Sequence, residues 1–163
     1  MGNAYLYRMP AGIPGVINRT TQATTEAGII DANYPPTSYG RFVKMVSGLI
    51  RTLASGDAAT DVIGLIARPY PYQETTASQP LGTAVPRTDL PCDILKRGYM
   101  TVLFSGTTAA KGGQVYVRIT ADTNKLVGNI EEAADSAKCV AVVGCFFMGA
   151  ADADGNVEIA YNI

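Results

Sequence analysis

The glycine-rich stretch at residues 105–113 is the part of this sequence that most resembles a site for chemistry. A phosphate-binding loop places its lysine after the last glycine and continues with Ser or Thr and a helix. Here Lys111 precedes Gly112 and Gly113, and the residues that follow, Gln-Val-Tyr-Val-Arg, are typical of a β-strand. The stretch therefore predicts a flexible surface loop without a nucleotide. It is too long for a tight turn, so either the loop has a function or the strands that it joins are not paired.

Two groups of acidic residues could bind a metal or transfer protons, but their spacing argues against both. Asp152-Ala-Asp-Gly-Asn begins like a calcium loop, which requires glycine at its sixth position and an acidic residue at its twelfth. This sequence has Val157 and Ile163 there, so the stretch predicts a hairpin turn. Glu131 and Glu132 are adjacent, so their side chains diverge, and we expect both on a solvated edge.

Histidine is absent, which excludes every Ser-His or Cys-His catalytic pair and every histidine metal site. The three cysteines, Cys92, Cys139 and Cys145, are an odd number and argue against a self-contained disulfide framework. On one strand, Cys139 and Cys145 would share a face about 20 Å apart, too far to bond. We expect free thiols in a reducing compartment, no metal, no cofactor and no catalytic residues, and hence no enzyme.

The elements that would position these residues are β-strands. Short apolar, β-branched and aromatic runs between turn residues predict about eight strands, the clearest at residues 98–104, 114–120, 139–147 and 157–163. Alternation places these residues on one face of the second and last runs: Val115, Val117 and Ile119, and Val157, Ile159, Tyr161 and Ile163. Residues 131–137 are the one credible helix. The predicted fold is all-β, a jelly-roll-like β-sandwich or barrel.

The first 39 residues have the composition of an extended arm. Prolines at positions 10, 14, 35 and 36 fix φ and remove hydrogen-bond donors, and a polar run covers residues 18–26. We therefore divide the chain into an N-terminal arm, residues 1–39, and a β-sandwich domain, residues 40–163. Two alternatives are open for the arm: it wraps its own domain as an edge strand and loop, or it adds backbone hydrogen bonds to a neighbouring subunit.

Charge excludes some classes of partner. The 13 basic and 14 acidic residues nearly cancel and form no long run of either sign, which argues against nucleic acid and against a membrane surface. The first residues show no charged segment leading into a long apolar run, so we expect neither a signal peptide nor a spanning helix. Charged residues are only 17% of the chain, so more uncharged surface is left to be covered, as in an assembly.

Six stretches together resemble the structural cement, or capsid decoration, proteins of tailed bacteriophages: residues 7–15, 34–40, 64–71, 97–102, 108–118 and 155–163. The resemblance extends over nearly the whole chain, and the order and number of the stretches carry it. It implies a jelly-roll-like protein that binds the outer surface of the assembled head and stabilises contacts between major capsid protein subunits. It also implies a virion location after assembly in the host cytoplasm, homo-oligomers with dimers favoured over trimers, and no catalytic residues.

If the arm makes part of the capsid or subunit contact, its aromatic and aliphatic side chains are the expected anchors: Tyr5, Leu6, Tyr7, Ile13 and Val16. A proline-stiffened segment loses little entropy on docking. The alternative function is a carbohydrate- or ligand-binding β-sandwich module of a phage tail. Tyr70, Tyr72 and Tyr99 could line its cleft, although the absence of Trp counts against it.

Overall fold

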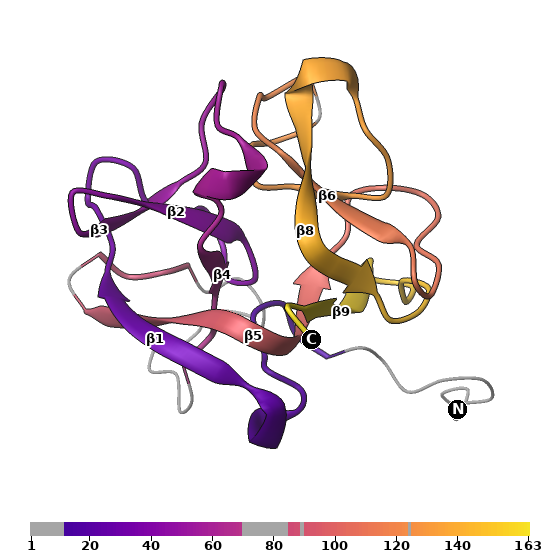
Figure 1. Cartoon of the computed structure of the whole chain (residues 1–163), viewed down its shortest axis with the longest axis horizontal. Helices are drawn as coiled ribbons and strands as arrows, with labels where there is room; N and C mark the ends of the chain where they lie inside the picture. The colour runs from indigo at the N-terminus through magenta and orange to yellow at the C-terminus, as the bar shows by residue number, and fades with distance from the viewer. Residues whose placement is uncertain (1–11, 70–84, 89, 124) are drawn as a thin grey trace.

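The computed structural model describes residues 12–69, 85–88, 90–123 and 125–163, and it confirms an all-β, jelly-roll-like fold (Figure 1). The strands are β1 (Thr24–Ile29), β2 (Phe42–Val46), β3 (Leu49–Thr52), β4 (Gly64–Ile66), β5 (Pro91–Leu103), β6 (Gln114–Arg118), β7 (Ile130–Glu131), β8 (Cys139–Phe147) and β9 (Asn156–Tyr161). The described residues add only three short 3₁₀ helices: η1 (Thr20–Gln22), η2 (Ala59–Asp61) and η3 (Ser136–Lys138).

β5 is paired along both of its edges. β1 lies antiparallel along residues 91–97 of β5, and the chain before β1 continues along the same edge. The opposite edge is shared by β4, which pairs with Ile94 and Leu95, and β9, which pairs with residues 98–103. The resulting strand order is β3-β2-β4-β5-β9-β8-β6-β7. In Figure 1, β5 runs below β4 and then turns upward beside β9, so it belongs to both halves of the fold.

Two hydrophobic clusters lie on opposite faces of the β2, β4 and β5 part of the sheet. Neighbouring residues in these strands enter different clusters: Phe42, Leu65 and Leu95 join the larger, and Val43, Ile66 and Ile94 join the smaller. Side chains alternate across a pleated strand, so a strand between two clusters must be apolar at consecutive positions. This explains why Gly64–Ile66 is buried throughout.

The burial of side chains along β6 and β9 follows the predicted alternation with one exception. Val115 and Val117 are fully buried, as are Val157 and Ile159, and Ile119 and Tyr161 are nearly so. The prediction that Ile163 shares the face of Val157, Ile159 and Tyr161 is wrong, because β9 ends at Tyr161 and Asn162 adopts a left-handed φ of 53°. Ile163 is 55% exposed. β6 pairs with β7 and β8 and not with β5, so the loop at residues 105–113 joins strands that are not neighbours.

The predicted helix at residues 131–137 is wrong. Ile130 and Glu131 form β7, which pairs with β6, and only the short η3 follows. The expectation of a solvated Glu131 is also wrong, because its side chain is 5% exposed. It lies opposite Tyr116 in the register and reaches the fully buried guanidinium of Arg118. A strand that pairs a buried carboxylate with a buried cation is favoured here over a helix that would expose it.

Arg118 is the centre of this buried ion cluster. Its Nε and Nη2 donate to the two Glu131 oxygens at 2.5 and 3.2 Å, and Nη2 also donates to Asp135 at 2.6 Å. Lys125 donates to Glu131 from the solvent side at 2.8 Å. Burial raises the pKa of Glu131, but the hydrogen bonds from Arg118 and Lys125 outweigh burial and leave the pKa below its usual value. The cluster therefore joins β6 to the segment that leads into β8.

The prediction that Cys139 and Cys145 share a face is wrong, although all three cysteines are free, as expected. Ala141 of β8 pairs with Tyr116 of β6, and Phe146 pairs with Gln114. The two pairs are five residues apart along β8 but only two residues apart along β6. This bulge reverses the alternation. Cys139 lies opposite Arg118, whereas Cys145 enters the larger cluster. The Gln114 amide stabilises the bulge by donating to the carbonyls of residues 142 and 145 at 2.8 and 3.2 Å.

Replacing Glu131 by Gln should destabilise the protein by about 3–5 kcal/mol, because it leaves the buried Arg118 charge without its main partner. For a chain of this size, that loss lowers the midpoint of thermal unfolding by roughly 10 °C. The matched control is Asp154→Asn, because Asp154 is an exposed carboxylate in a turn. We expect its free energy of unfolding to change by no more than about 0.5 kcal/mol. Equal midpoints for the two variants would contradict the importance of the buried pair.

Acid should weaken the same cluster. Hydrogen bonds from Arg118 lower the pKa of Asp135, and the pKa of Glu131 is also lowered in the folded state. Groups with a depressed folded pKa stabilise the protein fully above their unfolded pKa and lose that contribution as pH falls through the folded pKa. Thermal unfolding measured from pH 7 to pH 3 should therefore show the midpoint falling below about pH 4.5. A smaller acid-dependent decrease is expected in Glu131→Gln, and an identical one would refute this assignment.

Candidate functional site

The described part of the predicted arm, residues 12–39, is attached to its own chain. Gly15 N donates to Thr101 O at 2.8 Å, Thr101 N donates to Val16 O at 3.0 Å, and Asn18 N donates to Tyr99 O at 3.1 Å. β1 continues this pairing along β5, and Ile30 and Tyr39 are buried in the smaller cluster. The division at residues 39 and 40 stays a prediction. The described portion nevertheless matches the alternative in which the arm wraps its own domain.

Ile13 and Val16, two of the five predicted contact residues, lie together at the start of this segment. Val16 N donates to Ile13 O at 3.1 Å, which forms a turn, and both side chains are half-buried. Among the described residues, neither side chain belongs to a hydrophobic cluster of the core. Tyr5, Leu6 and Tyr7 lie outside the described residues.

A tight contact between two glycines attaches this turn to the sheet. Gly15 has a φ of +89°, and a Cβ built on it would lie 2.5 Å from Tyr39 Cβ. Gly40 has a φ of +76°, and its Cβ would lie 2.8 Å from Gly15 N. Arg68 closes the contact: its backbone N donates to Gly15 O at 2.8 Å, and its guanidinium lies 4.9 Å from the Tyr39 ring centroid. The turn that carries Ile13 and Val16 is therefore held in one position.

Polar side chains hold the next residues. Asn18 and Arg19 both donate to the Glu158 carboxylate, at 3.1 and 2.9 Å. The Arg19 guanidinium lies over the Tyr99 ring, 3.8 Å from its centroid. Tyr99 is therefore covered on one face by a cation of its own chain, in the position where a stacked sugar would lie. Tyr70 and Tyr72, the other tyrosines of the carbohydrate hypothesis, lie outside the described residues.

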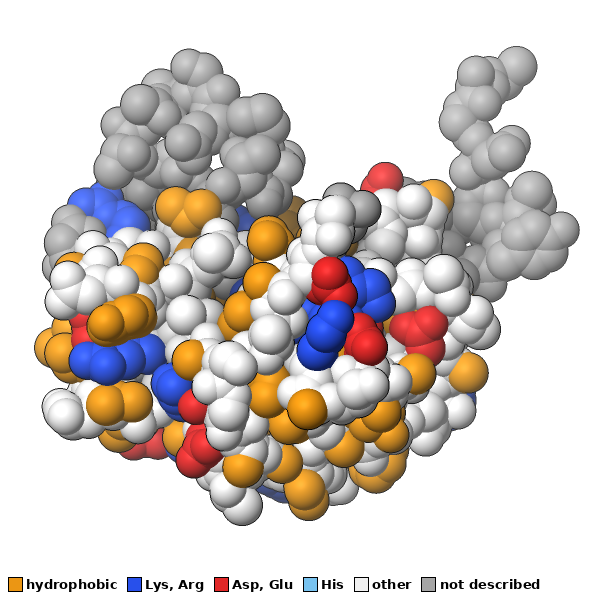
Figure 2. All heavy atoms as spheres, turned by 90° about the horizontal axis from the view of Figure 1, so that it is seen from above, with side chains coloured by type: hydrophobic (Ala, Val, Ile, Leu, Met, Phe, Trp, Pro, Cys, Tyr) orange, Lys and Arg blue, Asp and Glu red, His pale blue; other side chains and the backbone are white. Residues whose placement is uncertain are grey.

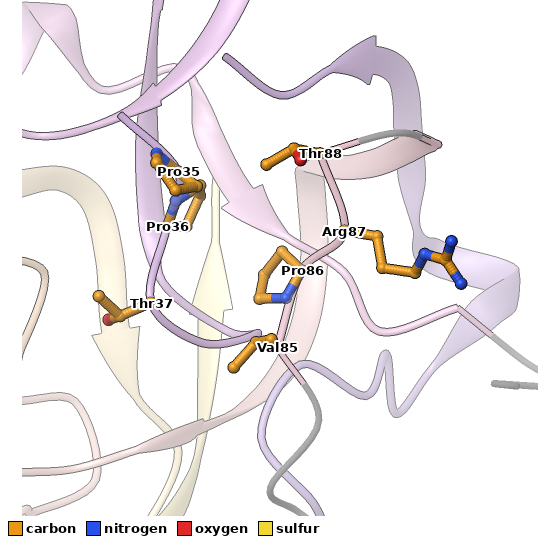
Figure 3. Close-up of a pocket in the computed structure, with 7 residues that line it drawn as sticks. All are labelled: Pro35, Pro36, Thr37, Val85, Pro86, Arg87 and Thr88. Atoms are coloured by element: carbon orange, nitrogen blue, oxygen red, sulfur yellow. The ribbon is translucent and has the colours of Figure 1, made fainter. Parts of the chain in front are cut away.

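A groove of about 510 Å³ lies between the end of the arm and the segment before β5. Its lining residues are Pro35, Pro36, Thr37, Val85, Pro86, Arg87 and Thr88. In Figure 3 the prolines and Val85 face one another across the groove, and the Arg87 side chain points away from it. Such a lining can bind apolar surface but offers no nucleophile or acid. Sequence reasoning missed this site, since no local pattern connects prolines fifty residues apart.

The loop at residues 105–113 is held by an acidic side chain. The backbone N and hydroxyl of Thr107 both donate to Glu132 at 3.1 Å. Gly106 is so close to this carboxylate that a Cβ would lie 1.6 Å from Glu132 Oε2. An anionic group therefore occupies the position where a phosphate would need donors, in agreement with the residue order of the loop.

The remaining candidate groups are also engaged in structure. Asp152 Oδ1 accepts the backbone N–H groups of Asp154 and Asn156 at 3.0 and 2.8 Å, which confirms the predicted turn. Burial raises the pKa of the three cysteine thiols, so they are protonated and poorly nucleophilic. In the part of the chain that the structure describes, no group of three acidic or cysteine residues could hold a metal, and no helix is long and apolar enough to cross a membrane.

Surface charge is dispersed. Figure 2 shows basic and acidic side chains in small mixed clusters on one face, with hydrophobic side chains exposed between them. Exposed large apolar residues occur in β1, β5 and β8: Ile29, Leu103, Val143 and Phe146 are between 42% and 76% exposed. This mixed surface suits a protein partner more than a polyanion.

Comparison with known proteins decides the family. A family model described as XM1 gp53 minor capsid protein matches residues 2–161. The chain belongs to this family. A solved chain from "The capsid of Myoviridae Phage XM1" has the same fold, with a TM-score of 0.69 at 18% identity over 99% of this chain and 97% of that chain. No curated protein sequence matches this chain.

Membership of the XM1 gp53 minor capsid family confirms the resemblance to capsid-associated phage proteins and gives the chain a structural role in the virion. The candidate contact surfaces among the described residues are the turn of Ile13 and Val16, the proline-lined groove and the exposed strand residues. The carboxylates of Glu131, Glu132, Asp135 and Asp152 accept hydrogen bonds within the fold, and the three thiols are buried or half-buried.

Replacing Gly15 by Ala should test how firmly the arm is attached. Gly48→Ala is the matched control, because Gly48 has a similar φ of +81° but no atom within 4 Å of the position that a Cβ would take. We expect the free energy of unfolding to fall by about 1 kcal/mol in the control, because of the left-handed backbone alone. In Gly15→Ala it should fall by at least about 2 kcal/mol, because the clash is added. Urea unfolding measures both. Equal losses of unfolding free energy in the two variants would mean that the structure around Gly15 accommodates the added methyl group without destabilisation.

Proposed function

We propose that this chain is a cement protein, which binds the outside of an assembled phage capsid and stabilises contacts between major capsid protein subunits. The observation that carries the proposal is the match to the minor capsid protein family over residues 2–161. The mixed, partly apolar surface and the use of the charged groups within the fold support a role that depends on binding and not on catalysis.

The mechanism is mass action. DNA packed in a phage head loads the contacts between capsid subunits, and a protein that binds only the assembled lattice stabilises that lattice by its binding free energy. Copies linked as homo-oligomers, dimers in our proposal, engage neighbouring capsid subunits with a high effective concentration, so each copy can bind modestly. The proposal requires assembly in the host cytoplasm and no nucleic acid or membrane partner.

The arm is proposed to supply part of the contact. The glycine contact fixes Gly15, so Ile13 and Val16 are presented without further ordering. Tyr5, Leu6 and Tyr7 precede Gly12 by five to seven residues in the sequence, which limits their reach to about 25 Å from it. These five residues could therefore act on one neighbouring capsid subunit.

Deleting residues 2–11 and replacing both Ile13 and Val16 by Asp are two separate tests. Ile13 and Val16 are outside the core clusters of the described residues, so the double Asp variant should keep the thermal midpoint of the wild type, and the midpoint of the deletion variant is measured beside it as a test of folding. In co-sedimentation with purified capsids, we expect the dissociation constant of each variant to rise at least about tenfold, because apolar contact is lost. The control is Leu126→Asp, because Leu126 is an apolar residue outside the arm whose side chain is 58% exposed; this variant should bind normally.

Unchanged binding by both folded variants would exclude the arm from the contact but leave the cement role open. Failure of the wild-type protein to bind capsids would overturn the cement role itself. A glycan array would test the alternative of a carbohydrate-binding module, which the Arg19 side chain over Tyr99 disfavours.

A further inference from the structure

Arg41 is a half-buried cation that no carboxylate of the described residues neutralises. Its Nε donates to Ser38 Oγ at 2.9 Å, and its Nη1 donates to Asn129 Oδ1. Both acceptors are neutral. Burial lowers the pKa of Arg41, because the loss of water disfavours the charged form. The described part of the fold therefore contains a positive charge without a matching negative one.

The two hydrogen bonds of Arg41 do not by themselves require a cation. Ser38 and Asn129 each accept one N–H, and the neutral amide of a glutamine could donate both. Elsewhere in the fold, the buried Arg118 has its charge matched by Glu131. A buried charge without such a partner is costly. A carboxylate from outside the chain would offset that cost at position 41.

The Arg41 side chain is held with its Nη2 at the surface. A Cβ on Gly128 would lie 3.3 Å from Arg41 Cδ, so the backbone before β7 packs against the side chain. Ser38 and Asn129 fix the other two nitrogens. Every fully buried nitrogen and oxygen among the described side chains has a hydrogen-bond partner, whereas Nη2 has none, so Nη2 must be accessible from outside. Both of its N–H donors are therefore available to a ligand.

The chemistry of this ligand follows from the charge of Arg41. Hydrogen bonds between a guanidinium and an ionised oxygen acceptor are among the strong ones in proteins, and a guanidinium that is already oriented loses little entropy in forming them. A nucleic acid would need a row of cations, whereas the basic and acidic side chains form small mixed clusters (Figure 2). A single carboxylate of a protein is therefore the fitting ligand.

Asp93 is a complementary group on the same chain. It is exposed on β5, and its carboxylate has no hydrogen bond or ion pair among the described residues. Its backbone is fixed on both sides, because Asp93 O accepts from Ala67 N at 2.8 Å and Asp93 pairs with Ala27 of β1. A carboxylate on such a strand is presented without further ordering.

We propose that Arg41 of one copy of this chain binds the Asp93 carboxylate of a second copy. Every copy carries both groups, so the contact forms between identical chains. One charge pair orients an association more than it drives it, so purified copies associate weakly and most readily at low salt. The contact deepens the homo-oligomer of the proposed function, on which its role in the virion rests, but it can be measured without a capsid.

Charge reversal tests this pair. Arg41→Asp and Asp93→Arg each bring like charges together, whereas an equimolar mixture of the two variants brings opposite charges together again. In a concentration series by sedimentation velocity at low salt, the dissociation constant should rise at least about tenfold for each variant alone. In the mixture it should return to within about threefold of the wild-type value.

Asp154→Arg is the matched control, because Asp154 is an exposed carboxylate in a turn outside β5. Mixed with Arg41→Asp, it should restore no association. Arg41→Gln is a second variant that keeps amide donors for Ser38 and Asn129 and removes only the charge. Its thermal midpoint shows that it is folded, and its dissociation constant should also rise at least about tenfold.

Any of three results would overturn the proposal: no concentration-dependent association of the wild type at low salt, wild-type association by folded Arg41→Gln, or no restored association in a mixture of folded Arg41→Asp and Asp93→Arg. Loss of capsid binding by Arg41→Gln with unchanged self-association would assign Arg41 to a capsid subunit instead, and would also overturn it. A wild-type protein that associates through this pair but binds no capsids would refute the cement role and leave the contact intact.

Discussion

The rest of the structure depends on the pairing of β5 along both edges. Hydrogen bonds to β1 and the preceding segment on one side, and to β4 and β9 on the other, make this strand common to both halves of the fold. At Gly98, where the pairing with β9 begins, φ is +140° and a Cβ would come within 3.1 Å of Ala23. A side chain there would oppose both the backbone angle and the close approach of the arm.

The second constraint is the buried charge of Arg118. An arginine without solvent must have its charge matched and its donors satisfied, and Glu131, Asp135 and the carbonyl of Thr120 do this. These partners come from the chain between β6 and β8, so the requirement fixes the path of a long, otherwise irregular connection. Buried ion pairs contribute modest net stability, and their value here is in selecting one arrangement of that connection.

Among the described residues, the features suited to function lie on the surface. Carboxylates hold loops and turns, burial suppresses the thiols, and one tyrosine face is covered by Arg19. The exposed strand residues, the half-buried aliphatic side chains of the arm and the proline-lined groove are all suited to protein contacts. This agrees with membership of a minor capsid protein family.

The sequence by itself determined the all-β class, the bounds of β8 at Cys139–Phe147 and the buried faces of β6 and β9, because these depend on alternation within single strands. Six stretches also carried the resemblance to capsid-associated proteins. Only the tertiary structure decided that Glu131 is buried, that Cys139 and Cys145 face different sides, and that residues 12–39 pair with β5. Each of these depends on a partner from a different strand: a cation on β6, a bulge against Gln114, and an edge of β5. Local patterns contain no information about such partners, because chain folding alone brings them together.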